Sequence, residues 1–202
     1  MPSSDFNQIG PIVELIVLTN PQSVLDVGCG FGKFGVLARE YLELWDGRGR
    51  YGDRTRRIDA VEAFEPYITP LHRFIYDEIL IGDAGGIIPG IEHAYDLALL
   101  IDVIEHQDRD AGHALILACL AKCRNVLVAT PKFPGEQGSL FGNPAETHRS
   151  SWQQADLQAL PNCFIVPHRD SLICFAGKDA KRVWSARLRA RLTRDDGSVN
   201  SP

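Results

Sequence analysis

The chain has 202 residues, of which 45% are hydrophobic, and a formal net charge of −5. This length suits a single globular domain with a substantial core. A negative net charge argues against broad electrostatic attraction to nucleic acid or to an anionic membrane surface. No apolar run reaches the ~18 residues of a membrane span.

Helical and strand patterns alternate along the chain, which predicts parallel βαβ units. We expect helices at 6–18, from the glycine turn to about residue 44, at 67–77, at 108–123 and from about residue 151. Strands are expected at 24–27, 58–64, 78–81, 95–101 and 126–129. Two further strands, 163–166 and 172–176, are joined by a short polar link that is typical of an antiparallel hairpin.

Residues 24–35 combine a buried strand, a glycine turn and the start of a helix. Gly28, Gly30 and Gly32 alternate after the strand, and a turn without Cβ atoms lets backbone amides approach a ligand closely. Asp26 precedes the first glycine by two residues, where a ligand with an amine or hydroxyl group would use a carboxylate. The alternative is a dinucleotide-binding turn, because Gly30, Gly32 and Gly35 also match Gly-x-Gly-x-x-Gly.

With Asp26 included, this segment resembles the first motif of the class I S-adenosylmethionine-dependent methyltransferases, Asp-x-Gly-x-Gly-x-Gly. The resemblance covers about residues 10–176 and implies an α/β fold: a three-layer, doubly wound, mostly parallel seven-stranded sheet with a C-terminal antiparallel hairpin strand. It also implies that the turn of Gly28, Cys29, Gly30 and Gly32 passes under the methionine and ribose of the cofactor. Asp26 would hold the turn and the amino-acid end.

The ends of the second and third strands carry further acids. In an open parallel sheet, ligands bind beyond the carboxyl ends of the strands. Glu62 is placed to accept the ribose hydroxyls, beside Ala63, although NAD-binding folds share an acid at this position. By resemblance, Asp83 meets the adenine amino group and Ala84 offers a backbone amide. Gly-Asp pairs are also common turn formers, so a purely structural role for Asp83 stays open.

The sequence Asp102-Val-Ile-Glu-His106 follows the fourth strand, where the reacting centre is expected. It resembles small-molecule methyltransferases, including those that methylate quinone and polyketide hydroxyls, and this places Asp102 near the amino-acid end of the cofactor. His106 is the candidate general base, because imidazole titrates near neutrality. Glu105 would orient His106 or cap the next helix. Alternatively, both residues start that helix and face solvent.

Several signatures of other enzymes are missing from the sequence. The Asn/Asp-Pro-Pro-Tyr motif of methyltransferases that act on nucleic-acid bases does not follow the fourth strand. Residues 130–133, Thr-Pro-Lys-Phe, lack the carboxylate and amide of metal-dependent catechol-type enzymes, so no metal ion is expected. None of the five tyrosines is followed by lysine four residues later, which disfavours a short-chain dehydrogenase.

Three segments outside the cofactor scaffold are candidates for recognising the substrate. In loop 131–150 and just after it, Glu146, His148 and Arg149 would bind or deprotonate a polar group and Trp152 would stack on it, with His148 as the second candidate base. The arginines of loop 46–57 would receive an anionic substrate or form a solvated face: Arg48, Arg50, Arg54, Arg56 and Arg57. The helix at 6–18 would form a lid over the sulfonium.

We expect a methyltransferase domain at 1–177, followed at 178–202 by a basic C-terminal helix and tail. The expected activity is O-methylation of a small-molecule or saccharide hydroxyl with S-adenosyl-L-methionine, by a monomer or homodimer without nucleic-acid or membrane partners. The alternatives are an NAD(P)-dependent oxidoreductase and a non-catalytic cofactor-binding subunit. The N-terminus lacks the pattern of a signal peptide, and the odd number of mostly apolar-flanked cysteines suggests reduced thiols, so we expect a cytoplasmic protein.

Overall fold

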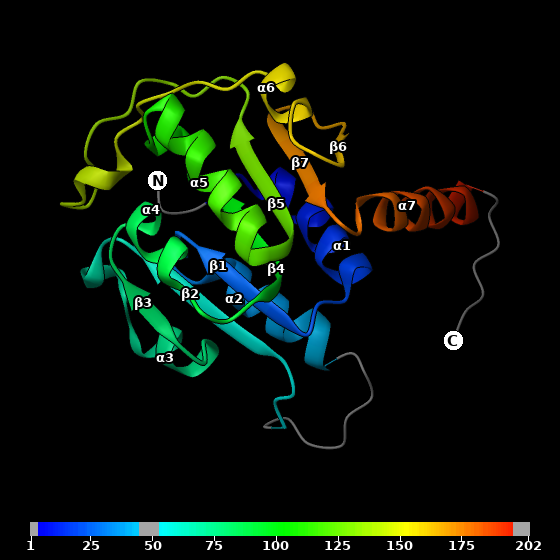
Figure 1. The fold of residues 1–202 in the computed structure, drawn as a ribbon, viewed down its shortest axis with the longest axis horizontal. Coiled ribbons are helices and arrows are strands. Elements are labelled where there is room, and N and C mark those ends of the chain that lie inside the picture. The colour runs from blue at the N-terminus through cyan, green and yellow to red at the C-terminus, as the bar shows by residue number, and fades with distance from the viewer. Residues whose placement is uncertain (1–3, 45–52, 196–202) are drawn as a thin grey trace.

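The computed structural model describes residues 4–44 and 53–195. Seven strands form one sheet in the order β3-β2-β1-β4-β5-β7-β6 (Figure 1). All neighbours pair in parallel except β7, which runs antiparallel to β5 and β6. This confirms the predicted seven-stranded sheet with its C-terminal hairpin. The strands are β1 (Ser23–Val27), β2 (Arg57–Glu62), β3 (Ile79–Ile81), β4 (Tyr95–Ile101), β5 (Cys123–Pro131), β6 (Cys163–Val166) and β7 (Ser171–Gly177).

Helices cover both faces of this sheet and give the three predicted layers (Figure 1). Strands buried on both faces carry continuous apolar runs, and one core forms on each face. Helices α1 (Ile9–Thr19), α2 (Lys33–Arg39), α3 (Pro70–Ile75) and α7 (Ala180–Asp195) pack on one face. Helices α4 (Ala84–Ile87), α5 (Arg109–Lys122) and α6 (Gln154–Gln158) pack on the other.

The strand order places a switch point between β1 and β4. The chain continues from β1 through β2 to β3 on one side and then returns to pair β4 with the other side of β1. Val27 at the end of β1 pairs with both Val61 and Leu100. The glycine turn after β1 therefore lies between the segments that follow β2 and β4, where ligands bind in open α/β sheets.

The helices differ from the predicted ones most clearly in α2, α3 and α4. The helix after the glycine turn is α-helical only to Arg39 and then widens into a π-helical turn, Glu40–Leu44. Helix α3 begins at Pro70 rather than near residue 67, because proline suits the first helical position and Thr69 caps it. Helix α4 was not predicted, since Gly85 and Gly86 have low helix propensity.

Helix α7 packs against α1 and is tied to it by charged contacts. Arg187 is buried and its Nε lies 3.0 Å from a carboxylate oxygen of Glu14, while Arg182 donates to the carbonyls of Leu18 and Thr19. The basic helix expected within 178–202 is thus present as α7, and residues 196–202 of the expected tail lie outside the described residues. None of the helices in 4–44 and 53–195 combines the length and apolarity that crossing a bilayer requires.

Candidate functional site

A cavity opens at the carboxyl edge of the sheet, over the ends of β1, β2, β3 and β4. His106 lines it, together with nine of the ten positions predicted to hold a cofactor: Asp26, Gly28, Cys29, Gly30, Glu62, Ala63, Asp83, Ala84 and Asp102. The tenth, Gly32, is the residue that precedes α2 in the same turn. The fold thus brings the predicted cofactor positions, far apart in sequence, around one hollow.

The glycine turn uses its own amides internally. Gly28, Gly30 and Gly32 have φ angles of 68°, 53° and 79°, a region that glycine enters without steric cost. The Gly28 amide donates to the Val61 carbonyl at 2.8 Å, and the Gly32 amide donates to the Cys29 carbonyl at 2.8 Å. The Gly30 amide donates to a Glu62 carboxylate oxygen at 3.0 Å. A phosphate-binding turn instead directs such amides at its ligand.

Glu62 ends β2 and joins the turn to the cavity wall. One carboxylate oxygen accepts from the Gly30 amide at 3.0 Å and the other accepts from the Phe64 amide at 2.9 Å. Burial raises the pKa of Glu62, although both amides lower it. The Cys29 thiol also donates to the oxygen that Gly30 contacts, at 3.9 Å. A carboxylate has about four acceptor positions, so about one remains for a ribose hydroxyl.

Asp26 lies in β1 beneath the turn and is almost fully buried. The Tyr76 hydroxyl donates to its carboxylate at 2.6 Å. Burial raises the pKa of Asp26 to about 6, and the hydrogen bond from Tyr76 opposes this rise. The carboxylate therefore connects β1 to the end of α3 while also lining the cavity.

Asp83 and Ala84 stand at the start of α4. The Asp83 side chain accepts from the Gly86 amide at 3.1 Å, so it caps this helix as well as lining the cavity. Asp83 therefore has a structural role as a helix cap, which is the alternative that the sequence left open. Its predicted contact with adenine stays a prediction.

Asp102 follows β4 and faces the N-terminal segment. Its φ is 55°, a left-handed conformation that aspartate adopts more readily than most residues. Gln8 donates to its carboxylate at 2.7 Å, and burial raises the pKa of Asp102. The Lys33 ammonium donates to the Ser4 carbonyl at 2.9 Å and lines the same cavity. The segment 6–18, expected to form a lid, thus touches the site through Gln8, and Ser4 just before it also lines the cavity.

His106 presents one ring nitrogen with a lone pair. Its Nδ1 lies 3.3 Å from the Thr147 carbonyl, and because a carbonyl only accepts, Nδ1 carries the hydrogen and Nε2 is the base. Burial lowers the pKa of His106, which favours the neutral ring. The His148 ring lies 5.0 Å away between centroids, and its Nδ1 donates to the Gly135 carbonyl at 2.6 Å. The two candidate bases are neighbours, but only His106 lines the cavity.

Glu105 lies behind the cavity wall. It is buried, and its carboxylate accepts from the Thr130 hydroxyl at 3.0 Å rather than contacting solvent. Burial raises the pKa of Glu105 above its usual range, which favours the protonated form. The suggestion that it caps the next helix is wrong, since Asp108 holds the position before α5. The alternative in which Glu105 starts that helix and faces solvent is wrong as well.

Neither a protein-family model nor a curated protein matches the sequence. Solved structures do match. An O-methyltransferase family protein from Burkholderia thailandensis shares 10% identity over 84% of this chain and 56% of its own, with a TM-score of 0.57. The N-terminal domain of EvdMO1, solved with SAH (S-adenosylhomocysteine) and D-fucose, shares 12% identity over 87% of this chain and 84% of its own, with a TM-score of 0.59. The methyltransferase domain of bacterial CtHen1-C shares 16% identity over 85% of this chain and 98% of its own, with a TM-score of 0.55.

The chain has the class I methyltransferase fold. It spans little more than half the length of the Burkholderia protein. At these identities the likeness shows the shared fold alone.

The loop after β5 agrees with its prediction at Glu146 and differs from it at Trp152. Asn143 and Glu146 line the cavity, and the Tyr67 hydroxyl donates to a Glu146 carboxylate oxygen at 3.0 Å. The expectation that Trp152 stacks on a substrate is wrong. Its side chain is 1% exposed, and its indole N–H lies 3.3 Å from the Ile104 carbonyl, inside the core beside α5.

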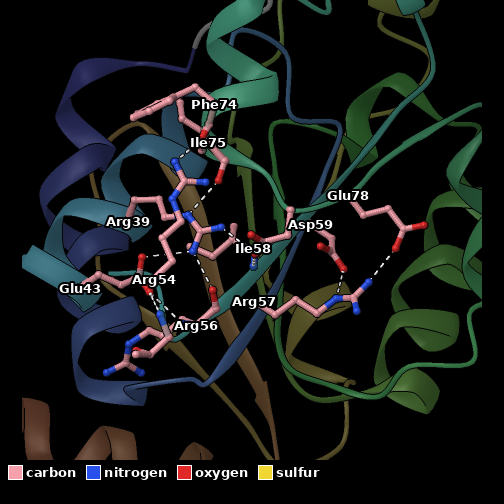
Figure 2. Close-up of polar contacts among 12 residues, drawn as sticks. Arg39, Glu43, Arg54, Arg56, Arg57, Ile58, Asp59, Phe74, Ile75 and Glu78 are labelled. Carbon is pink, nitrogen blue, oxygen red and sulfur yellow. Dashed lines mark hydrogen bonds and ion pairs between the residues drawn. The ribbon is translucent and has the colours of Figure 1, made fainter. Parts of the chain in front are cut away.

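The arginines of 53–57 are engaged within the protein (Figure 2). Arg54 donates to the Phe74 carbonyl, and Arg57 bridges Asp59 at 2.5 Å and Glu78 at 2.6 Å. Arg56 donates to the Leu42 carbonyl at 2.9 Å and to two further groups near residue 20. Arg54 and Arg57 are exposed, which agrees with the expected solvated face, and all three side chains also hold neighbouring segments of the fold together. The other two members, Arg48 and Arg50, lie outside the described residues.

Sequence reasoning missed several cavity residues. Lys33 and Tyr67 line the cavity, and Gln8 reaches it by its hydrogen bond to Asp102. Lys33 follows the glycine turn directly, so its position was a usable signal. Gln8 belongs to the segment 6–18 that was expected to cover the site, although no motif singled it out. Tyr67 comes from a segment with no motif, and only the folded chain places it at the site.

Proposed function

We propose that the chain is an S-adenosylmethionine-dependent methyltransferase that acts on a hydroxyl group of a small molecule or saccharide. The observation that carries this is the charge of the cavity. Among residues 4–44 and 53–195, the lining of the cavity holds one lysine, Lys33, no arginine and five carboxylate side chains: Asp26, Glu62, Asp83, Asp102 and Glu146. Such a wall favours a ligand with a sulfonium and an α-amino group over the two phosphates of a dinucleotide.

The residues present fit this cofactor. Glu62 keeps a free acceptor position for a ribose hydroxyl, and Asp83 with the start of α4 would border the adenine. Asp102 and Asp26 would face the amino group, while Lys33 would pair with the carboxylate of the same ligand. When bound, S-adenosylmethionine supplies a methyl group that is already activated for transfer.

The chain itself has to align an acceptor and remove its proton. His106 does this in our proposal, because its Nε2 carries the lone pair and its lowered pKa keeps the ring neutral. His148 stays the second candidate base, and Glu105, buried behind the cavity wall, is assigned no proton transfer. A hydroxyl acceptor agrees with the O-methyltransferase and the D-fucose-containing structure among the similar folds.

The test of the cofactor is a comparison of two ligands. A ligand at 100 times its Kd stabilises a protein by about 2.7 kcal/mol, which is about 5–11 °C in Tm for a domain of this size. S-adenosylhomocysteine is expected to give such a shift, and NADH is not. A shift with NADH alone would favour the oxidoreductase alternative.

Glu62→Gln tests the site itself. The amide cannot accept from both Gly30 and Phe64 and also serve the ribose, so we expect affinity for S-adenosylhomocysteine to fall at least tenfold by titration calorimetry. Glu92→Gln is the matched control, because Glu92 is exposed ahead of β4 at the opposite edge of the sheet. Methyl transfer is then assayed with labelled cofactor and a panel of phenols and sugars. Binding without transfer to any of them would favour the non-catalytic alternative.

A further inference from the structure

Helix α3 presses two ring side chains against the glycine turn. His72 is fully buried, and its Nε2 lies 2.7 Å from the Gly30 carbonyl. Tyr76, four residues later, is nearly buried and donates to Asp26 at 2.6 Å. Tyr76 is the residue that directly follows α3, so the helix and its C-terminal cap contact both the glycine turn and the strand that precedes it.

The contacts of His72 fix which of its ring nitrogens carries the hydrogen. The Gly30 carbonyl only accepts, so Nε2 carries the hydrogen. The Thr69 amide only donates, and it lies 3.1 Å from Nδ1, so Nδ1 carries the lone pair. One imidazole thus caps α3 with one nitrogen and holds the glycine turn with the other.

Tyr76 also explains a glycine that the sequence left ambiguous. A Cβ at Gly35 would overlap the Tyr76 ring, so Gly35 provides the space through which Tyr76 reaches Asp26. A Cβ at Gly32 would lie 3.5 Å from His72 and 3.7 Å from Tyr76, in ordinary contact. The turn and the two rings therefore pack as one unit.

We propose that His72 and Tyr76 are positioning residues that hold the glycine turn and Asp26 in the shape that binds the cofactor. Neither ring lines the cavity, so each acts through the turn. This inference rests on the proposed function, because it takes S-adenosylmethionine as the ligand of the turn.

Tyr76→Phe tests the hydrogen bond to Asp26. Its matched control is Tyr95→Phe, which removes an equally buried tyrosine–aspartate hydrogen bond, to Asp59 at 2.5 Å, away from the cavity. Asp59 keeps its bond from Arg57 in Tyr95→Phe, so this variant is expected to lose no more stability than Tyr76→Phe. Affinity for S-adenosylhomocysteine should fall about tenfold in Tyr76→Phe and stay within twofold in Tyr95→Phe.

The pH profile of binding separates positioning from a general loss of structure. The ionised Asp26 favours the ligand's ammonium group, so affinity weakens as pH falls through the Asp26 pKa, near 6. Tyr76 lowers that pKa, and its loss moves the weakening to higher pH. Glu62 and the Cys29 thiol also face Asp26, and both are unchanged in either variant. The Tyr95→Phe profile should match the wild type.

His72 is tested with two amide variants. His72→Gln places an N–H near Nε2 and keeps the bond to Gly30, whereas His72→Asn places an acceptor near Nδ1 and keeps only the cap on α3. We expect His72→Gln to retain affinity for S-adenosylhomocysteine within about threefold and His72→Asn to lose about tenfold. Circular dichroism and Tm confirm that each variant folds.

The outcomes distinguish a failure of this inference from a failure of the proposed function on which it rests. Wild-type protein that does not bind S-adenosylhomocysteine overturns the proposed function and, with it, the ligand assigned to the turn. Wild-type binding with equal affinity and pH profile in Tyr76→Phe and Tyr95→Phe, or equal loss in the two His72 variants, overturns the positioning role alone.

Discussion

Gly28→Ala is expected to destabilise the protein by an amount that the structure allows us to work out. The new Cβ would lie 2.7 Å from a Val103 methyl group, and the backbone φ of 68° is unfavourable for alanine. The left-handed conformation costs about 1–2 kcal/mol. Overpacking adds about 1–3 kcal/mol, because valine is restricted at χ1 and cannot rotate away freely. The expected loss is therefore about 2–5 kcal/mol, measured by urea unfolding.

Val103→Ala separates the two contributions. Alone it removes part of a half-buried side chain and costs about 1 kcal/mol. In the double variant the overlap disappears and only the conformational cost at Gly28 remains. The two changes should therefore couple favourably by about 1–3 kcal/mol in a double-mutant cycle.

Additive losses in that cycle would refute this account of Gly28. A Gly28→Ala variant as stable as the wild type would do so as well, because it would mean that the turn tolerates a Cβ. Gly90→Ala is the control, since nothing lies within 4 Å of its Cβ position and its φ is not left-handed. It should change the unfolding free energy by less than about 1 kcal/mol.

Three other measurements follow from the contacts. His106→Ala should leave affinity for S-adenosylhomocysteine within twofold while methyl transfer slows by about 10²–10⁴; unchanged turnover would move the base to another residue. Arg124 lowers the pKa of Asp179 to about 2, so the wild type should lose stability as pH falls from about 5 to 2 and Asp179→Asn should lose less over that range; parallel pH curves would contradict this. Glu14→Gln leaves the buried Arg187 guanidinium without its carboxylate and should cost about 2 kcal/mol in urea unfolding, a figure reduced because Glu14 is partly exposed; a neutral effect would show that the pair contributes little.

The topology could be predicted because it depends on patterns that are local in sequence. Buried strands are continuous apolar runs, and the hairpin follows from two such runs joined by a short polar link. The switch point then follows from strand order alone. Helix α4 could not be predicted, because two glycines oppose it and it is stabilised by its cap from Asp83 and its packing against β2 and α5.

The acids at the strand ends could be predicted for the same reason, since parallel strands end at one edge of a sheet. The side chains that pack against these elements from distant parts of the sequence could not be predicted. Trp152 was assigned to substrate stacking because it follows a polar loop, yet it is buried against Gly112 of α5. A Cβ at Gly112 would lie 2.7 Å from the indole ring. A glycine inside an otherwise regular helix was the available signal that a large side chain packs there.

The role of each glycine distinguishes the methyltransferase motif from the dinucleotide-binding motif, both of which residues 24–35 match. In a dinucleotide fingerprint the glycines let a pyrophosphate approach free amides. Here the Gly28, Gly30 and Gly32 amides each have an acceptor within the protein, and Gly35 makes room for Tyr76. The space that glycine provides is therefore filled by the chain's own side chains. What the turn offers a ligand is a carboxylate-lined wall, which suits a cation better than a phosphate.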